Sequence, residues 1–584
     1  MKRLDLRFLP FLLGLTLLVV GTRINAQEPS QVDQETADRI EACMGCHSKE
    51  AGAGPAVDLE KLRQSPHASF DCQTCHDAIT ELPHTPQMTA KKPQCATCHA
   101  DEVEAFRKST HSREDYVKGD HPSCVFCHGG GAPHAITAGS KWTREQKVQV
   151  CTQCHSQTER MERYHVDPEA VTSYLESFHG KALLRFGNYD TAICTDCHSH
   201  HDVLAPMNPA APTYPTNVAK TCGQEGCHPG SQANFALSGA NHLRLKIKHD
   251  SLLAGVLWFF RLLIFGTIAF MAVSIILDLV QVVFRSQEPP RCGRPAGIFI
   301  SLSYFSLIAT IIIVTVRANG AGIAAWATLA FLVLAWIAYF FRRNRHVPVA
   351  TQRLYPRMNL NLRLQHFLLL SSVTALVATG LPLRFAAAQI SVQELNMIGG
   401  LDNSRLIHRI AAVGLIVVAI WHVLYLLARW RKFGGSIRSW RMLPNKKDLE
   451  DFNLVTKGYL GMTKEKPKFD HFTFRSKIDY LAEYWGVPVM VLSGLVLWFP
   501  MYFSTWMPEA AWPISFIAHG YEATLAFLAV VCWHLYNVLF NPNNFPFNTL
   551  WITGKLTREE MSREHPLELE RLDAADMGDG GNGE

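Results

Sequence analysis

The feature that most constrains this chain is a cysteine–histidine motif that recurs through its first 230 residues. Six times the sequence reads Cys-x-x-Cys-His, and a seventh motif has four residues between its cysteines. The cysteines are Cys43, Cys46, Cys72, Cys75, Cys95, Cys98, Cys124, Cys127, Cys151, Cys154, Cys194, Cys197, Cys222 and Cys227. The histidines that follow them are His47, His76, His99, His128, His155, His198 and His228. Because these motifs use 14 of the 16 cysteines, the group that they bind must dominate the fold of this region.

The spacing predicts covalently attached c-type haem. Two thiols one helical turn apart reach the two vinyl groups of one porphyrin, and the adjacent imidazole then faces the iron. Paired cysteines in exported chains ordinarily form disulfides, and Cys-x-x-Cys pairs also hold zinc. Neither use explains a histidine directly after every second cysteine. We therefore expect seven haem c groups in an exported domain packed around porphyrins, with little regular structure and short helices.

Other histidines are placed to supply the second ligand of each iron. Three lie in the context Ser-x-His before a motif and three follow a motif at short range, which suggests a repeated unit of histidine, motif and histidine. These candidates are His67, His84, His111, His134, His179 and His201. The remaining histidines of the region lie outside this pattern and are weaker candidates: His121, His165, His200, His242 and His249. Iron held by two imidazoles has no vacant position, which favours electron transfer over substrate chemistry.

Residues 40–230 resemble the multihaem c-type cytochromes. In that resemblance the longer seventh motif has a precedent, because tetrahaem cytochromes of the c3 type also use four residues between the cysteines. The resemblance implies a chain of haems that conducts electrons.

Beyond residue 250 the sequence becomes strongly apolar. Charged residues make up only 18% of the whole chain, against about 25% in soluble domains. Seven stretches are long enough to cross about 30 Å of hydrocarbon as helices. They are residues 262–284, 297–316, 323–341, 367–383, 406–428, 484–503 and 514–540. We therefore expect an all-α membrane domain of about seven transmembrane helices, with membrane lipid as its surroundings.

Leader and loop charges predict the orientation. Lys2 and Arg3, an apolar run from Phe8 to Val20, and Ala26 have the layout of a secretory leader over residues 1–26. The loops 285–294, 342–365 and 429–477 carry an excess of Lys and Arg, whereas 387–405 and 504–512 together hold one Arg and three acids. This places the haem domain in the periplasm, the helices in the inner membrane and the acidic tail, expected to be disordered after Arg563, in the cytoplasm. The net charge of +5 is too small to suggest nucleic acid.

Five histidines lie in or beside the predicted spans, where histidine is rare and functional by default. They are His366, His408, His422, His519 and His534. The fourteen residues from His408 to His422, and the fifteen from His519 to His534, each cover about 21 to 22 Å of helix. His408 and His519 then meet at one face of the membrane, and His534 meets His366 or His422 at the other. A lone histidine would more often serve packing or proton relay, but five at matching depths predict two haem b groups in a four-helix bundle.

Residues 360–560 resemble the cytochrome b subunit of formate dehydrogenase and of nickel–iron hydrogenase. The segments that carry the resemblance are Arg363-Leu-Gln-His366, Thr379-Gly-Leu-Pro382, Arg405-Leu-Ile-His408-Arg409, Ser493-Gly-Leu-Val-Leu-Trp498 and Gly554-Lys555. The resemblance implies that His408 pairs with His519 and His366 with His534. Two departures stand out: the last two histidines are fifteen residues apart where that family has fourteen, and His422 has no counterpart there.

The whole order resembles the inner-membrane fusions of a multihaem c domain with a diheme b domain in metal-reducing bacteria. The predicted regions are a leader (1–26), a heptahaem domain (27–250), three helices (251–345), a diheme b domain (346–556) and a tail (557–584). The resemblance implies oxidation of menaquinol or ubiquinol, with electrons passed to periplasmic cytochromes, other redox proteins or extracellular acceptors. Quinone-site candidates are Lys477, Asp479 and Glu483 beside His534, with Glu522 beside His519 as the rival. Two alternatives stay open: quinone reduction by a periplasmic dehydrogenase or hydrogenase, and a reductase with one five-coordinate c haem.

Overall fold

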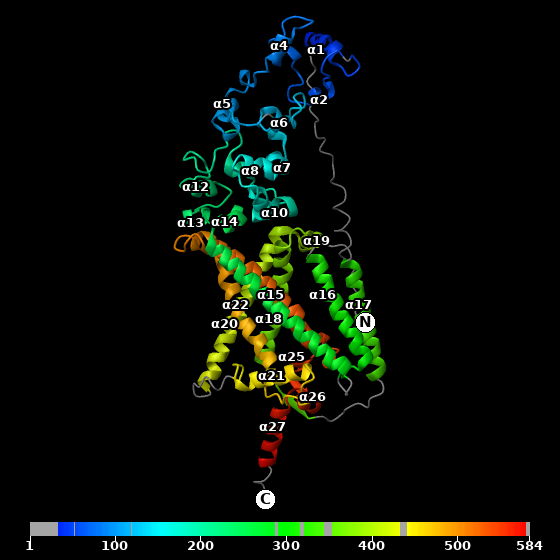
Figure 1. Ribbon diagram of the computed structural model, residues 1–584. Coiled ribbons are helices and arrows are strands. Elements are labelled where there is room, and N and C mark those ends of the chain that lie inside the picture. The colour runs from blue at the N-terminus through cyan, green and yellow to red at the C-terminus, as the bar shows by residue number, and fades with distance from the viewer. Residues whose placement is uncertain are drawn as a thin grey trace, which may run out of the picture. The chain divides into compact units, whose positions relative to one another are not determined.

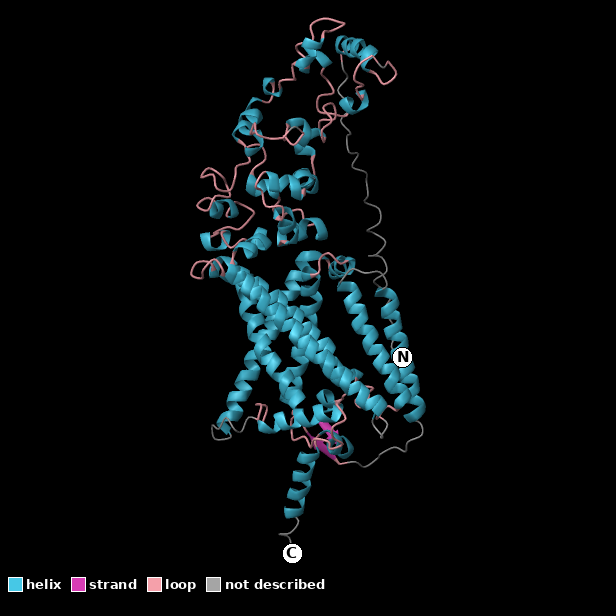
Figure 2. Cartoon of the chain, viewed as in Figure 1, coloured by secondary structure: helices cyan, strands magenta, loops and turns pink. Residues whose placement is uncertain are grey.

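The computed structural model describes residues 33–51, 53–117, 119–285, 290–315, 321–343, 353–432 and 441–579. The predicted leader lies outside these residues. The described chain is mostly helical (Figure 2). It forms two compact units, Met1–Thr143 with His200–Leu204, and Arg144–Ser199 with Ala205–Glu584. This division differs from the expected boundary at residue 250, because residues 144–199 and 205–249 belong to the same unit as the membrane helices.

The first unit is built from short helices joined by loops (Figure 1). They are α1 (Gln34–His47), α2 (Leu59–Arg63), α3 (Cys72–Cys75), α4 (Pro86–Ala90), η1 (Cys95–Thr97), α5 (Ala100–Lys108), η2 (Thr110–Ser112), α6 (Cys124–Gly129) and η3 (Gly139–Lys141). Of the described residues in this unit, Ile40 is the only buried apolar side chain. One such side chain contributes about 2 to 3 kcal/mol, whereas ordering the backbone costs about 1 to 2 kcal/mol per residue. The polypeptide alone therefore lacks the core that this unit needs.

The second unit begins with similar short helices. They are α7 (Arg144–His155), α8 (Thr158–Arg163), α9 (Ala170–Glu176), α10 (Phe178–Phe186), α11 (Cys194–His198), α12 (Val218–Cys222), α13 (Ala233–Ala236), η4 (Ala240–His242) and α14 (Leu243–His249). Helix α10 packs on the membrane part through Ala182, which is buried with Leu395 and Leu401. Leu395 belongs to α19 (Gln389–Ile398) and Leu401 to the helix that follows it.

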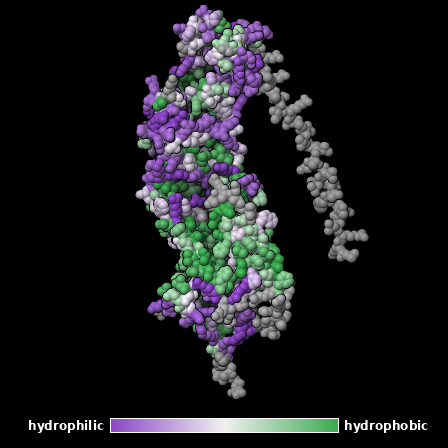
Figure 3. Space-filling model, turned by 45° about the vertical axis from the view of Figure 1, so that its right-hand side comes forward, coloured by the Kyte–Doolittle hydropathy of each residue, from purple (hydrophilic) through white to green (hydrophobic). Residues whose placement is uncertain are grey.

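Seven described helices are long and apolar enough to cross a membrane, as the sequence predicts. They are α15 (Ser251–Leu279) with η5 (Val280–Arg285), α16 (Arg294–Thr315), α17 (Ala321–Arg343), α18 (Leu360–Arg384), α20 (Gly400–Lys432), α22 (Phe474–Trp498), and α24 (Ala511–Leu528) with η7 (Ala529–His534) and η8 (Tyr536–Phe540). Large apolar side chains such as Phe265 and Trp326 are 74% and 72% exposed, and a hydrophobic band covers these helices (Figure 3). A surface of this kind requires lipid.

The sixth of these helices is displaced from its predicted bounds. It runs from Phe474 to Trp498 rather than over 484–503, because a separate short helix, α23 (Pro500–Phe503), starts at a proline. Proline favours the first turn of a new helix over the interior of an existing one. The helix begins at Phe474, where the side chain of Thr473 caps the first turn, so Lys477, Asp479 and Glu483 lie in the first turns of α22.

Within the membrane part, α18 packs along α20 and α22 along α24, while α16 pairs with α17. Helix α15 crosses α24 and is tied to this bundle by Asp278, which is buried. Asp278 accepts hydrogen bonds from the hydroxyls of Tyr459 (2.5 Å) and Tyr536 (2.7 Å) and forms an ion pair with Arg475 (3.1 Å). A buried carboxylate with this many partners fixes the position of α15.

At the opposite end of the bundle from α19, the chain forms a small capping region. It contains α21 (Lys446–Tyr459), α25 (Leu550–Thr553), α26 (Arg558–Glu564), α27 (Pro566–Asp579) and the strands β1 (Leu354–Pro356) and β2 (Lys555–Thr557), which pair antiparallel. The expectation of disorder after Arg563 was wrong, because α27 continues to Asp579. The side chain of Leu569 in α27 joins a buried cluster with Tyr355, Leu556 and Met561. The tail is therefore acidic overall but has an apolar contact that orders it.

Candidate functional site

Each cysteine–histidine motif lies on or beside a single helical turn. The turn α3 runs from Cys72 to Cys75, and α11 runs from Cys194 to His198. In α3 the Asp71 carboxylate accepts a hydrogen bond from the backbone N–H of Thr74 and caps the turn. All sixteen cysteines are described, and none of them forms a disulfide. The local fold therefore holds two thiols and an imidazole together without joining the thiols.

Six motif histidines lie opposite a second histidine at a nearly constant distance. The separations of the ring centres are 5.9 Å for His47–His84, 6.2 Å for His67–His99, 6.3 Å for His76–His134, 6.1 Å for His128–His201, 6.0 Å for His179–His228 and 6.4 Å for His198–His242. A metal–nitrogen distance of about 2 Å on each side, plus about 1 Å from nitrogen to ring centre, gives centres roughly 6 Å apart. These pairs therefore fit one iron between two imidazoles.

Five of the six predicted second histidines take part in such pairs. A second histidine does not always pair with the motif nearest to it in the sequence. His67 lies just before the second motif, yet it faces His99 of the third. His242, which lies outside the repeated sequence pattern, faces His198. The sequence offered no indication of this pairing beyond the presence of an additional histidine. His111 lies in η2, and His155 is the last residue of α7.

Hydrogen bonds and burial prepare several of these rings as ligands. Nδ1 of His47 lies 2.9 Å from the carbonyl oxygen of Pro55, and Nδ1 of His128 lies 3.1 Å from that of Thr137. A hydrogen on Nδ1 that donates to a carbonyl leaves Nε2 free to bind metal. Burial, with a smaller effect of the neighbouring His242, lowers the pKa of His198 to about 4. That imidazole is neutral at physiological pH, as a ligand must be.

Thiols of successive motifs lie side by side. Cys72 interacts with Cys43, Cys75 with Cys95, and Cys124 again with Cys95. In the second unit Cys194 interacts with Cys151, and Cys197 with Cys222. Groups attached at these thiols would touch at their edges. Among the described residues, no three His, Cys, Asp or Glu side chains are arranged to hold a metal ion by themselves.

In the membrane part, His408 of α20 faces His519 of α24 with 6.3 Å between ring centres. Nδ1 of His408 lies 2.8 Å from the hydroxyl of Thr379, and Nδ1 of His519 lies 3.1 Å from that of Ser493. Each hydroxyl donates to a carbonyl of its own helix, from Thr379 to Ala375 and from Ser493 to Val489, at 2.6 Å. Each hydroxyl oxygen therefore accepts from Nδ1–H and leaves Nε2 for iron. We call this arrangement the His408–His519 site.

Glycines complete the His408–His519 site. A Cβ atom on Gly380 would lie 3.1 Å from Cε1 of His408, and one on Gly494 would lie 3.2 Å from Cε1 of His519. Each hydroxyl residue is thus followed by the glycine that makes room for the same ring. The segments Thr379-Gly and Ser493-Gly were noted in the sequence as points of resemblance, and the structure gives them a physical role.

Cationic side chains gather near this site. Lys181 of α10 lies near Arg384 at the end of α18, and burial together with Arg384 lowers the pKa of Lys181. The Arg384 side chain packs against Gly520, next to His519, and its guanidinium lies over the Tyr521 ring. Within the described part of the chain neither cation has an ion-pair partner. Two partly buried cations near each other are stabilised by an anion, and the carboxylates of a porphyrin would supply one.

The second membrane pair differs in its surroundings. His366 of α18 and His534 of η7 interact electrostatically, and we call this pair the His366–His534 site. Nδ1 of His534 lies 4.0 Å from the Asp479 carboxylate, whereas the buried Nδ1 of His366 has no hydrogen-bond partner among described residues. His534 lies in π-helical backbone. A π turn absorbs one extra residue, which accounts for the fifteen-residue interval between His519 and His534.

His422 is engaged at both ring nitrogens. Nδ1 lies 2.7 Å from Oε1 of Gln365, and Nε2 lies 2.9 Å from the hydroxyl of Tyr480. Because an amide oxygen only accepts, Nδ1 donates to it and Nε2 accepts from the tyrosine. No lone pair of His422 is left for iron. Its neighbour Gln365 holds it beside the His366–His534 site and outside the pair.

The four quinone-site candidates are placed differently. Lys477 is buried in an ion pair of 2.8 Å with Asp448 of α21. Asp479 and Glu483 both interact with His534, and Glu483 is exposed on α22. Glu522 is 3% exposed and lies against the Gly486 backbone, and its Oε2 is unpaired among the described atoms. The structure therefore groups only Asp479 and Glu483 around His534.

Residues 357–544, which include α18 through η8, match the family model described as prokaryotic cytochrome b561, of the nickel-hydrogenase cytochrome b type. No match to a curated protein was found. This region is thus a membrane electron-transfer domain of the cytochrome b561 type. The family implies b haems and suggests a quinone partner in the membrane.

Proposed function

We propose that this protein oxidises quinol in its membrane domain and passes electrons through a chain of seven c-type haems to periplasmic or extracellular acceptors. The observation that carries the proposal is the recurrent histidine pair. Six pairs that include a motif histidine, together with His408–His519, have ring centres 5.9 to 6.4 Å apart. Haem iron bound in this way changes charge by one electron without a change of ligand.

Neighbouring side chains orient the histidine rings of the His408–His519 site for metal binding. Thr379 and Ser493 fix the tautomers of His408 and His519, and Gly380 and Gly494 admit their rings. At the other end we propose His366 and His534 as the second pair of ligands, with His422 excluded by its two hydrogen bonds. The paired imidazoles leave no open position for a substrate at these sites, which supports electron transfer over a reductase activity.

For the quinone we propose the His366–His534 site. Quinol releases two protons when it loses two electrons, so its site needs groups that accept protons. Asp479, with 35% of its side chain exposed, and the exposed Glu483 provide carboxylates beside His534. Lys477 is held by Asp448 and is not available for this role. The enclosure of Glu522 makes it a poor alternative, because quinone must enter from the lipid.

The orientation of the helices supports outward transfer. The loops on the side of α21 and α26 are rich in Lys and Arg, which supports a cytoplasmic location for that side. The His366–His534 site then lies near the cytoplasmic face and the cysteine–histidine motifs in the periplasm. Menaquinol and ubiquinol both fit the proposal. Soluble cytochromes are suitable acceptors because the first three motifs include exposed cysteines, namely Cys46, Cys75, Cys95 and Cys98.

The experiment is a pyridine haemochrome assay on the full-length protein, with spectra recorded before and after addition of a quinol analogue. We expect seven c-type haems for every two b-type haems, both reduced by the quinol. The variant His534→Ala should lose one b-type haem and reduction by quinol while keeping the c-type haems. Absence of b-type haem, or retention of both in this variant, would overturn the assignment.

A further inference from the structure

An aromatic path leads from the seventh cysteine–histidine motif into the membrane helices. The ring of His228 contacts Phe235 with 5.1 Å between centres, and Phe235 contacts Trp512 at 6.4 Å. Trp512 stacks on Phe516 at 5.2 Å with 17° between the ring planes. Phe516 lies one helical turn before His519 in α24. A ligand of the seventh motif is thereby joined to a ligand of the His408–His519 site through three aromatic side chains.

A second contact connects the partner histidines of the same two pairs. His179, which faces His228, follows Phe178 at the start of α10. The guanidinium of Arg405 lies 5.7 Å from the centre of the Phe178 ring. Arg405 lies one helical turn before His408 in α20. Both members of the His179–His228 pair are therefore linked to the His408–His519 site, each through a different helix.

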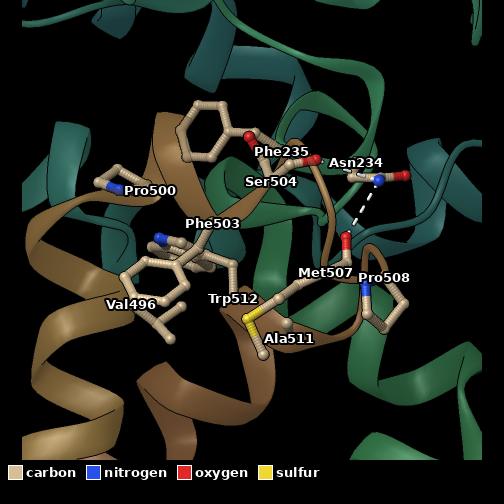
Figure 4. Close-up of a pocket in the computed structure, with 10 residues that line it drawn as sticks. All are labelled: Asn234, Phe235, Val496, Pro500, Phe503, Ser504, Met507, Pro508, Ala511 and Trp512. Atoms are coloured by element: carbon tan, nitrogen blue, oxygen red, sulfur yellow. Dashed lines mark hydrogen bonds between the residues drawn. The ribbon is translucent and has the colours of Figure 1, made fainter.

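Polar contacts hold this junction together. The side-chain amide of Asn234 donates to the backbone carbonyls of Ser504 (3.1 Å) and Met507 (3.0 Å), beside Phe235 and Trp512 (Figure 4). Lys246 forms an ion pair of 2.9 Å with Glu509. The cavity lined by Asn234, Phe235 and Trp512, among others, has a volume of about 10 Å³, room for about one water molecule. These polar contacts and the close packing join the seventh motif to the end of the membrane helices.

The unpaired cations Lys181 and Arg384 lie at the same junction. Lys181 is two residues after His179, and Arg384 packs against Gly520, which follows His519. Each cation therefore lies close to one histidine of a pair, where it would neutralise the carboxylates of a bound porphyrin. If Lys181 and Arg384 neutralise the carboxylates of both porphyrins, the two porphyrins can lie close together without repulsion between their negative charges.

We propose that the seventh motif, with His228 and His179, is the point at which electrons cross between the membrane domain and the haem chain, and that Phe235 and Trp512 form the contact. This inference rests on the proposed haem sites. One electron crosses at a time: the iron of the His408–His519 site is oxidised by one electron, the iron of the His179–His228 pair is reduced by one, and no proton is needed. Crossing therefore occurs at the last motif of the sequence, and electrons reach the earlier motifs afterwards.

The test follows reduction of the b-type haems in full-length protein mixed with a water-soluble one-electron donor, a reduced viologen, in a stopped-flow spectrometer. Replacing Cys222 and Cys227 with Ala removes the seventh attachment, and replacing Cys43 and Cys46 with Ala removes the first. In the wild-type protein, reduction of the b-type haems should follow reduction of the c-type haems. We expect this later phase to be lost in the Cys222/Cys227 variant and kept in the Cys43/Cys46 variant. In an equilibrium redox titration, the potential of the b-type haem nearest the junction should also change in the former variant only.

Substitutions that keep every haem attachment provide the second arm. Phe235→Leu and Trp512→Leu should slow the b-type phase without changing the ratio of c-type to b-type haem. The matched control is Trp506→Leu, since Trp506 lies at the same end of the bundle but is 60% exposed and outside the path. Equal rates of b-type haem reduction in all these variants would overturn the inference. If the seventh-motif variant fails to assemble, the rates in the two leucine variants provide the test. Because no quinol is used, failure of quinol to reduce the wild-type protein would refute the proposed function separately.

Discussion

The two membrane histidine pairs use the same ligand type in opposite surroundings. At the His408–His519 site, both Nδ1 atoms meet neutral hydroxyls whose own protons are bound to helix carbonyls. At the His366–His534 site, a carboxylate lies 4.0 Å from one Nδ1 and the other is unpaired among described residues. The first pair lies in α-helices and the second includes a π-helical segment. The first site is thus surrounded by neutral hydrogen-bond partners, whereas the second has an ionisable carboxylate beside one ring.

Electron transfer and proton exchange make different demands on the residues around a haem. Electron transfer between bound groups needs constant distances, and glycines, hydroxyls and the packing around Trp512 supply them. Exchange of protons with a quinone needs accessible carboxylates, and we propose Asp479 and Glu483 for this role. The four predictions below address this contrast, beginning with the largest expected effect.

Removing one ligand from the second site should eliminate a whole haem. His366→Ala leaves His534 without a partner, so we expect one b-type haem per protein in place of two. The control is His422→Ala, which removes a histidine of the same region that is engaged by Gln365 and Tyr480, and which should keep both haems. The pyridine haemochrome assay measures the difference. Loss of a b-type haem in His422→Ala alone would show that His422, and not His366, is the ligand.

Sequence analysis predicted the seven spans, because runs of about twenty apolar residues have few other uses. It also located the cytochrome b region, because segments such as Thr379-Gly-Leu-Pro382 and Ser493-Gly-Leu-Val-Leu-Trp498 resemble that family. It could not decide between His366 and His422, since this depends on Gln365 and Tyr480 reaching one ring from two helices. The pairing of His67 with His99 was equally hidden. Periodicity reports which residues share a helix face, but contacts between distant short helices leave no periodic signal.

Filling the space beside one ring should weaken haem binding at the first site without abolishing it. In Gly380→Ala the new methyl group would lie 3.1 Å from Cε1 of His408, and such overpacking costs about 1 to 3 kcal/mol. We expect partial occupancy of one b-type haem in the haemochrome assay. Gly255→Ala on α15, where a Cβ would meet nothing within 4 Å, should retain full occupancy. Full occupancy in both variants would mean that the glycine is not part of the site.

Removing the negative charge beside His534 should raise the midpoint potential of the second haem. An anion near Nδ1 strengthens donation to iron and favours its oxidised form. At an effective dielectric constant near 20, such a charge contributes on the order of 1 to 2 kcal/mol, or roughly 50 to 90 mV for a one-electron couple. Potentiometric titration of Asp479→Asn measures the shift. The control Asp402→Asn, whose carboxylate is 81% exposed at the start of α20, should leave both b-type potentials unchanged.

The smallest effect should come from the neutral hydroxyls of the first site. Thr379→Val and Ser493→Ala each remove an acceptor from an Nδ1–H, and a neutral hydrogen bond contributes only about 1 kcal/mol. Each change should raise the potential of the first haem by less than Asp479→Asn raises that of the second. The shifts should add in the double variant, because the two hydroxyls act on opposite rings. Thr328→Val removes a hydroxyl that donates to Ala324 in the same way but faces no histidine, so it should change neither potential. A shift from Ser493→Ala as large as that from Asp479→Asn would show that charge does not distinguish the two sites.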